Sequence, residues 1–346
     1  MDAVIAPSKT DTPLSAAKDS SKAIAILQSL TARDMEQVNT LIVERITSQA
    51  ALVPKLTGYT FDSGGKRLRP MLTIAAAHIG NPEAGNHISL ATAVEFMHTA
   101  TLLHDDVVDD SHLRRGQPTA RVIWDNRSSI LVGDFLLGRA FELMVEAGSL
   151  EALGVLSQAA AVIAEGEVMQ LSAAKEVNTT EETYLQVIDA KTATLFAAAT
   201  QTGAIIAGLE KDVEIALKNY GRNLGMVFQL VDDALDYGGT AITTGKLQGN
   251  DFQEGKITLP VILAMAAGDE KEHGFWRRTL GENQIIRDGD FERAREILER
   301  HKSLSGTLAC AQYYGAQAQS ALNAVPKSVW RKTLMELVDF CIHRTH

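Results

Sequence analysis

Two short clusters of aspartates are the residues in this chain whose types and spacing best suit chemistry. They are Asp105-Asp106-Val-Val-Asp109 and Asp232-Asp233-Ala-Leu-Asp236, and an apolar run precedes each. Residues four apart on a helix share a face, so the first and third carboxylates of each cluster lie side by side and repel. A bound cation removes that repulsion, and clustered carboxylate oxygens suit magnesium, which completes its coordination with water and phosphate oxygens. One such cluster arises easily by chance, but two at the ends of apolar helices predict a shared metal and diphosphate site.

Basic residues beside glycines supply candidate partners for a diphosphate. The segment Gly64-Gly-Lys-Arg-Leu-Arg-Pro70 carries three positive charges to an expected helix start at Pro70, and Arg114-Arg115 follow the first aspartate cluster. Arginine matches phosphate oxygens with two parallel hydrogen bonds, whereas lysine acts as a point charge. Three further lysines stand alone in the sequence: Lys191, Lys246 and Lys256. Each by itself is more often a surface charge, but together with the glycines and aspartates they favour a phosphate site.

The elements that position these residues are expected to be helices. None of the eight prolines lies between Pro118 and Pro260, and the residues in between are rich in helix formers. Strand patterns are scarce. We therefore predict an all-α fold, a single large antiparallel helical bundle around a deep central apolar cavity. Residues 21–346 would form this domain and residues 1–20 a disordered arm.

Several expected helices are apolar on more than one face, notably residues 129–138 and 185–207. Such a helix is buried either in a large core or at an interface between copies of the chain. We interpret the pattern as a homodimer. A larger monomeric core is the alternative.

Charge and composition exclude other classes of protein. The net charge of −10 argues against a nucleic-acid partner, because binding a phosphate backbone needs a basic surface. Only two cysteines occur, which favours a reducing, cytoplasmic location over a disulfide framework. No run approaches the 18 or so consecutive apolar residues of a membrane span, so we predict none. Peripheral contact with a membrane surface is left open.

The motifs resemble those of the trans-isoprenyl (polyprenyl) diphosphate synthase family, in its long-chain type such as octaprenyl, solanesyl or decaprenyl diphosphate synthases. The match covers the chain from about Gly64 to Pro260. It rests on Gly-Gly-Lys-Arg-Leu-Arg-Pro (64–70), Leu-Leu-His-Asp-Asp-Val-Val-Asp (102–109), Arg-Arg-Gly (114–116), Lys-Thr (191–192), Gln-Leu-Val-Asp-Asp-Ala-Leu-Asp (229–236) and Glu-Gly-Lys-Ile-Thr-Leu-Pro (254–260). Their order and spacing together make the resemblance specific.

The resemblance implies a prenyltransferase that adds isopentenyl diphosphate repeatedly to an allylic diphosphate such as farnesyl or geranyl diphosphate. It implies three magnesium ions held by Asp105, Asp106, Asp109, Asp232, Asp233 and Asp236. The allylic diphosphate would be bound by Arg114, Lys191, Lys246 and Lys256, and isopentenyl diphosphate by Lys66, Arg69, His98 and Arg115. Thr192 and Gln229 would direct oxygen dipoles at the allylic cation. Together with Lys191 they would form the set of catalytic residues. From the residues alone, His98 is as readily a buried core histidine as a ligand contact.

The length of the product follows from the helix that carries the first cluster. Ala100 and Thr101 stand one turn before Asp105, and Met97 stands one turn further back. In short-chain relatives aromatic residues block this wall, so by resemblance the channel here runs deeper. Because a helix rises about 5.4 Å per turn, close to one extended isoprene unit, roughly eight to ten units (about C40–C50) need a channel about as long as a 25-residue helix. We predict such a product, of the kind used as a quinone side chain as in ubiquinone, with a geranylgeranyl-length product as the nearer alternative.

Three other classes fit the sequence less well. A terpene cyclase takes no second diphosphate and would lack Lys66 and Arg69, and a non-catalytic subunit of a heteromeric synthase would have lost aspartates from one cluster. A carboxylate-bridged di-iron protein is suggested by Glu95-x-x-His98 and Glu270-x-x-His273. The second pair, however, falls in a polar stretch that we expect to be exposed.

Overall fold

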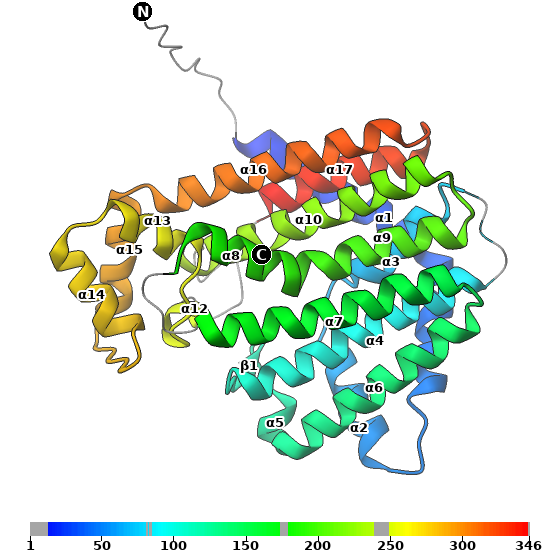
Figure 1. Cartoon of the computed structure of the whole chain (residues 1–346), viewed down its shortest axis with the longest axis horizontal. Coiled ribbons are helices and arrows are strands. Elements are labelled where there is room, and N and C mark those ends of the chain that lie inside the picture. Colours follow the sequence, from blue (N-terminus) through cyan, green and yellow to red (C-terminus); the bar gives the residue numbers. More distant parts are fainter. Residues whose placement is uncertain (1–12, 81, 83–84, 174–178, 239–248, 345–346) are drawn as a thin grey trace, which may run out of the picture.

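The protein is a bundle of helices. A computed structural model describes residues 13–80, 82, 85–173, 179–238 and 249–344. Within these ranges almost every element is a helix, and consecutive long helices such as α9 (Thr194–Ile206) and α10 (Lys211–Gly238) run in opposite directions (Figure 1). The predicted all-α fold is confirmed.

The other helices follow in chain order. The long ones are α1 (Pro13–Arg45), α4 (Asn86–Val108), α6 (Asn126–Glu146), α7 (Leu150–Ala173), α16 (Ser303–Ala321) and α17 (Val329–His343). The shorter ones are α2 (Leu52–Asp62), α3 (Leu68–Ala77), α5 (Ala120–Ile123), α8 (Glu181–Ile188), α12 (Asn250–Gln253), α13 (Leu259–Ala267), α14 (Glu270–Leu280) and α15 (Asp290–Arg300). A π-helical turn, η1 (Asp189–Ala193), joins α8 to α9, and a 3-10 turn, η2 (Leu322–Ala324), follows α16.

The first helix begins earlier than predicted. α1 starts at Pro13, so the helix includes residues 13–20, which were expected to belong to a disordered arm. The domain boundary at residue 21 stays a prediction. Proline is favourable in the first turn of a helix, and Ala16 and Ala17 are strong helix formers. Residues 1–12 lie outside the described part of the chain.

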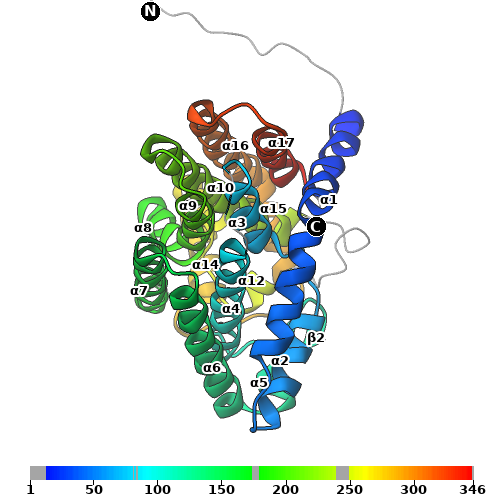
Figure 2. The same cartoon turned by 90° about the vertical axis from the view of Figure 1, so that its right-hand side faces the viewer.

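The core is built around α4, which lies in the middle of the bundle and contacts α1, α3, α6 and α9 (Figure 2). One apolar cluster joins α4 to α6, α7 and α9, and a second joins α3 and α9 to α10, α16 and α17. Burying these faces accounts for helices that are apolar nearly all round. α4 and α10 both run toward the end of the bundle where α12 lies, so the two aspartate clusters arrive at the same end (Figure 1).

A short β-hairpin with two residues in each strand follows α4, and it was not predicted. β1 (Leu113–Arg114) pairs antiparallel with β2 (Gln117–Pro118). The turn between them has positive φ at both central residues, 53° at Arg115 and 75° at Gly116. Such a turn matches the twist of a hairpin, and glycine adopts it without strain. The hairpin holds Arg114 and Arg115 beside the first aspartate cluster.

One helix satisfies the length and composition of a membrane span, which the sequence analysis did not identify. Leu150–Ser172 of α7 has a mean hydropathy of 1.3 in its most apolar window, and 28% of that window is buried. Alanine, valine and leucine dominate the helix although the apolar run is interrupted by Glu165 and Glu167. α7 packs on α6, α8 and α9, so one side belongs to the core and the other presents an apolar surface.

Candidate active site

The two aspartate clusters share cationic neighbours, although they lie far apart in the sequence. The Nζ atom of Lys256 is 2.9 Å from Oδ2 of Asp109 in the first cluster. Lys256 also interacts electrostatically with Asp251 and with Asp233 of the second cluster. The structure therefore brings the ends of α4 and α10 together around one ammonium group.

Each aspartate of the first cluster is paired with a different cation. Lys191 Nζ lies 3.5 Å from Asp105 Oδ2, and Arg114 Nη2 lies 2.7 Å from Asp106 Oδ1. Lys256 completes the set at Asp109. Three of the cations predicted to bind the allylic diphosphate thus surround the first cluster. The fourth, Lys246, lies outside the described residues.

The second cluster is held differently. Asp232 Oδ1 pairs with Arg344 Nη2 at 3.0 Å, while Asp236 accepts the backbone N–H of Asp251 at 3.0 Å. Asp233 accepts hydrogen bonds at both oxygens, from the Tyr184 hydroxyl and from Gln229 Nε2. Asp233 is therefore fixed by side-chain donors, whereas Asp232 is held by one cation.

Burial separates the middle aspartate of each cluster from its neighbours. Asp106 and Asp233 are buried, whereas Asp105, Asp109 and Asp232 are partly exposed. Burial raises the pKa of Asp106 against the opposing effect of Arg114, and burial raises the pKa of Asp233 to about 7 against its hydrogen bonds from Tyr184 and Gln229. Burial disfavours the ionised form of these two carboxylates, and the hydrogen-bond donors and the arginine beside them favour it.

The cations predicted for a second diphosphate also come together. Arg69 Nη1 is 3.1 Å from His98 Nε2, and a Cβ atom on Gly65 would stand 2.8 Å from the Arg115 guanidinium. Burial lowers the pKa of Arg69 to about 10, and burial together with Arg69, Arg114 and Arg115 holds the pKa of His98 well below its usual range. His98 is therefore neutral and accepts a hydrogen bond from the Arg69 guanidinium. Lys66 lies over the Phe340 ring, 5.0 Å from its centroid.

A hydrogen-bonded chain links Thr192 to the second cluster. Thr192 Oγ1 donates to Gln229 Oε1 at 3.0 Å, and Gln229 Nε2 donates to Asp233 Oδ1 at 2.8 Å. Thr192 stands in η1, whose wider turn lies against α10 at Gly225. A Cβ atom at Gly225 would come within 2.6 Å of the Ala193 Cα atom, so glycine is what allows this approach. The two residues predicted to face the allylic cation are in direct contact.

The residues predicted to limit chain length lie in the apolar core behind the first cluster. Ala100 and Met97 are buried in the cluster shared by α4, α6, α7 and α9. Thr101 is half-buried, and its hydroxyl donates to the backbone oxygen of His98 at 2.8 Å. Small side chains are frequent in this cluster, which includes Ala93, Ala140, Ala159, Ala198 and Ala199. The deep cavity expected here stays a prediction.

Four residues near the clusters were missed. Glu167 Oε2 lies 2.8 Å from Lys191 Nζ, and Asp251 is half-buried and interacts electrostatically with Asp236 and Asp233. Tyr184 and Arg344 contact the second cluster directly. Glu167 follows Glu165 by two residues on a largely apolar helix, and this pair of carboxylates is a signal in the sequence. Tyr184 on α8 and Arg344 beyond α17 belong to no motif in the sequence that indicates a site.

The site chemistry fits a divalent cation. The clustered groups offer hard carboxylate oxygens, the donor type that magnesium prefers. Oε1 of Glu167 is buried and has no hydrogen-bond partner among the residues that the structure describes. Burial and the charge of Asp105 raise the pKa of Glu167, while Lys191 opposes this effect.

Two aspartate clusters at one end of a helical bundle, with cations from several elements beside them, have the chemistry of an enzyme class that binds diphosphates with a divalent metal. The family model described as "Polyprenyl synthetase" matches residues 50–298. The chain belongs to this family, and the predicted resemblance to isoprenyl diphosphate synthases is confirmed. Members of the family are prenyltransferases that act on isoprenoid diphosphates and generally use magnesium.

Long-chain synthases are among its relatives. Octaprenyl diphosphate synthase of Escherichia coli (strain K12) is 42% identical over 320 residues, covering 92% of this chain and 98% of the relative. A solved polyprenyl synthase from Caulobacter crescentus CB15, complexed with calcium and isoprenyl diphosphate, has a TM-score of 0.90 and 49% identity and covers 93% of this chain and 98% of that one. A decaprenyl diphosphate synthase from Rhodobacter capsulatus has a TM-score of 0.89 and 48% identity, with coverages of 93% and 99%.

Proposed function

We propose that this protein makes long-chain all-trans polyprenyl diphosphates, of roughly eight to ten isoprene units by the helix-rise argument. The observation that carries the proposal is the convergence of both aspartate clusters on Lys256, with the Arg69–His98 pair beside them. The two sets of cationic side chains fit two diphosphate substrates. A terpene cyclase binds one diphosphate and does not need the second set. The long-chain activity named for the Escherichia coli and Rhodobacter capsulatus relatives supports the same assignment.

Magnesium ions, three of them by family resemblance, would neutralise the allylic diphosphate as it leaves. All six aspartates remain candidate ligands. The partly exposed carboxylates of Asp105, Asp109 and Asp232 suit direct binding best, because each is held through one oxygen by a single cation. Asp106 and Asp233 are buried and already bonded, which suits positioning of their neighbours.

The residues of the chain then have distinct tasks. Arg114, Lys191 and Lys256 hold the departing diphosphate, and these positive charges need no reorganisation when the carbon–oxygen bond breaks. Thr192 and Gln229 present oxygen atoms to the allylic cation. The double bond of isopentenyl diphosphate, bound by Lys66, Arg69, His98 and Arg115, attacks this cation to form the new carbon–carbon bond. A proton then leaves the adjacent carbon for the departing diphosphate, which restores a double bond.

The growing chain is proposed to enter the apolar cluster behind Asp105. Ala100 and other alanines of this cluster have small side chains, which suits a path for a growing chain, and apolar walls keep water from the cation. This favours a long product, for a quinone side chain, over the geranylgeranyl-length alternative.

The active form is proposed to be a cytoplasmic homodimer. α6 and α7 lie next to each other and expose large apolar side chains, with Leu131 67%, Val145 65% and Val168 62% exposed. A second copy of the chain would bury them, which accounts for the apolar outer side of α7 without a membrane span. Cys310 and Cys341 are both free thiols, in keeping with a reducing compartment.

Release of pyrophosphate tests the reaction class. The purified protein should release it when farnesyl diphosphate, isopentenyl diphosphate and magnesium are all present, and a chelator should stop the reaction. Release from farnesyl diphosphate alone at the same rate would indicate hydrolysis or cyclisation and would refute the proposed condensation.

A further inference from the structure

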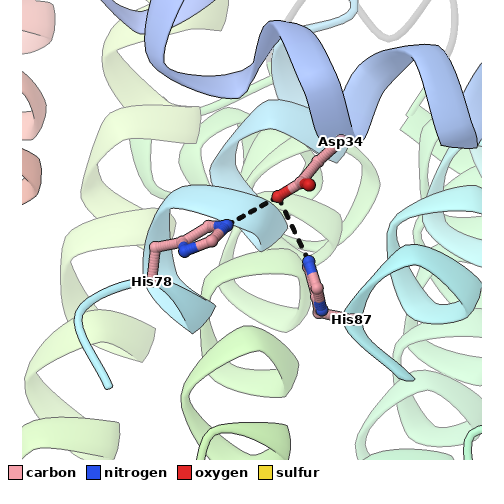
Figure 3. Close-up of side chains that lie close together, drawn as sticks. All are labelled: Asp34, His78 and His87. Carbon is pink, nitrogen blue, oxygen red and sulfur yellow. Dashed lines mark hydrogen bonds and ion pairs between the residues drawn. The ribbon is translucent and has the colours of Figure 1, made fainter. Parts of the chain in front are cut away.

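Three side chains meet at the end of α4 that is remote from the aspartate clusters. Asp34 comes from α1, His78 caps the C-terminal end of α3, and His87 stands in the first turn of α4 (Figure 3). His87 and Asp105 lie on the same helix, so its rise separates them by about 27 Å. This cluster is therefore separate from the diphosphate site.

Their metal-binding atoms point at one another. Asp34 Oδ2 lies 2.6 Å from His78 Nε2 and 3.2 Å from His87 Nε2, as the dashed lines in Figure 3 show. The three atoms all lie within 4.8 Å of one another. Tetrahedral bonds of about 2.0–2.2 Å to one metal would set such atoms roughly 3.3–3.6 Å apart. The distance from His87 to Asp34 is close to this range, and His78 needs to move outward by roughly 0.7–1.0 Å.

The surroundings permit that movement. The His78 side chain is 33% exposed and stands at a helix end, whereas those of Asp34 and His87 are 14% and 8% exposed. One face of the His78 ring stacks on Trp330, with the ring centroids 4.9 Å apart. Two ligands are thus held in the core, and the third lies at the surface, where water can complete the coordination.

Hydrogen bonds within the cluster fix the charge of Asp34. Burial raises the pKa of Asp34, but hydrogen bonds from His78 and His87 outweigh it and bring the pKa below its ordinary value, so the carboxylate is ionised. His87 Nδ1 is buried and has no hydrogen-bond partner among the described residues. When Nε2 binds a metal, Nδ1 carries the remaining proton of the neutral imidazole, so its buried position without a partner is a cost of the site.

We propose that Asp34, His78 and His87 bind one divalent transition-metal ion of the zinc class. Two imidazole nitrogens and one carboxylate oxygen, with water at the open position, match zinc better than magnesium. The ion would tie α1 to α3 and α4. The site is structural and takes no part in the condensation.

Calorimetric titration with zinc chloride, with magnesium present in excess, tests the proposal. The native protein should show one more zinc equivalent than the His78→Gln variant, because removing a ligand weakens the site by roughly 100-fold or more, beyond the 10–100-fold typical of outer-shell changes. His273→Gln is the matched control, since the His273 side chain is 35% exposed and lies near Glu270. It should retain the zinc equivalent.

Asp34→Asn provides a second variant in case His78→Gln fails to fold. Zinc should raise the melting temperature of the native protein and of His273→Gln, but not that of either cluster variant, because only a ligand of the folded state stabilises it. Cobalt substitution should give visible d–d bands that vanish in the same two variants. Equal zinc stoichiometry in the native protein and both cluster variants would overturn the proposal. The three side chains would then form a hydrogen-bonded cluster that binds no metal.

Discussion

The ammonium of Lys256 lies 2.9 Å from Asp109 Oδ2, although 147 residues separate the two in the sequence. Burial by itself would lower the pKa of Lys256, but Asp109, Asp251 and Glu254 raise it well above its ordinary value. Lys256 is therefore positively charged at neutral pH. Among the described residues it is a cation that interacts with both aspartate clusters.

Replacing Lys256 by glutamine should lower kcat by about 10²–10³-fold, the range seen when one preorganised group that stabilises developing negative charge is lost. The measurement is steady-state pyrophosphate release. Lys55→Gln, at an exposed lysine on α2, is the control and should leave kcat unchanged. An unaltered kcat in Lys256→Gln would remove this lysine from the catalytic site.

Asp233 should make the stability of the magnesium-free protein depend on pH. Its pKa rises from 3.8 to about 7 on folding, chiefly through burial. The folded state therefore holds this proton more tightly than the unfolded state, and the stability it contributes is fully present below pH 3.8 and is lost as pH rises toward 7.

Urea unfolding of the native protein and of Asp233→Asn, across this pH range, measures the effect. The native protein should lose stability relative to the variant by up to about 1.4 kcal/mol per pH unit. Parallel pH curves for the two proteins would show that Asp233 titrates as it does in the unfolded chain.

Ala100→Phe should shorten the product sharply while leaving the first addition largely intact. Ala100 is fully buried behind the first cluster, so a phenyl ring there blocks the proposed path of the growing chain. Product length is read by chromatography after dephosphorylation. Products of native length from an active Ala100→Phe enzyme would place the path elsewhere.

Val145→Glu should convert the proposed dimer to monomers, because it puts a charge on the apolar face shared by α6 and α7. Sedimentation velocity measures the change. Val329→Glu on α17, at a valine that is 52% exposed, is the control and should remain dimeric. A native protein that sediments as a monomer would contradict the assignment of this face.

The sequence predicted the residues whose chemistry shows in a local pattern. The aspartate clusters, the Gly64–Pro70 segment and the Lys191–Thr192 pair each combine several chemical groups within one or two turns, and their order along the chain is specific. The helical fold followed from the absence of prolines in the middle of the chain and from scarce strand patterns. The motifs and the helical fold can be predicted because each depends on residues that are close together in the sequence.

The residues that were missed depend on neighbours in space. Arg344 reaches Asp232 from beyond the last helix, and Tyr184 reaches Asp233 from α8. Asp34, His78 and His87 come from three helices, so no spacing rule connects them. Only tertiary packing creates such contacts, and a single sequence does not encode them as a motif.

Product analysis tests the central claim most directly. The purified protein is incubated with radiolabelled isopentenyl diphosphate, farnesyl diphosphate and magnesium, and the dephosphorylated products are sized. Chains of roughly eight to ten isoprene units, as the helix-rise argument requires, are the expected result. Products that stop at geranylgeranyl length, or no elongation at all, would contradict the account.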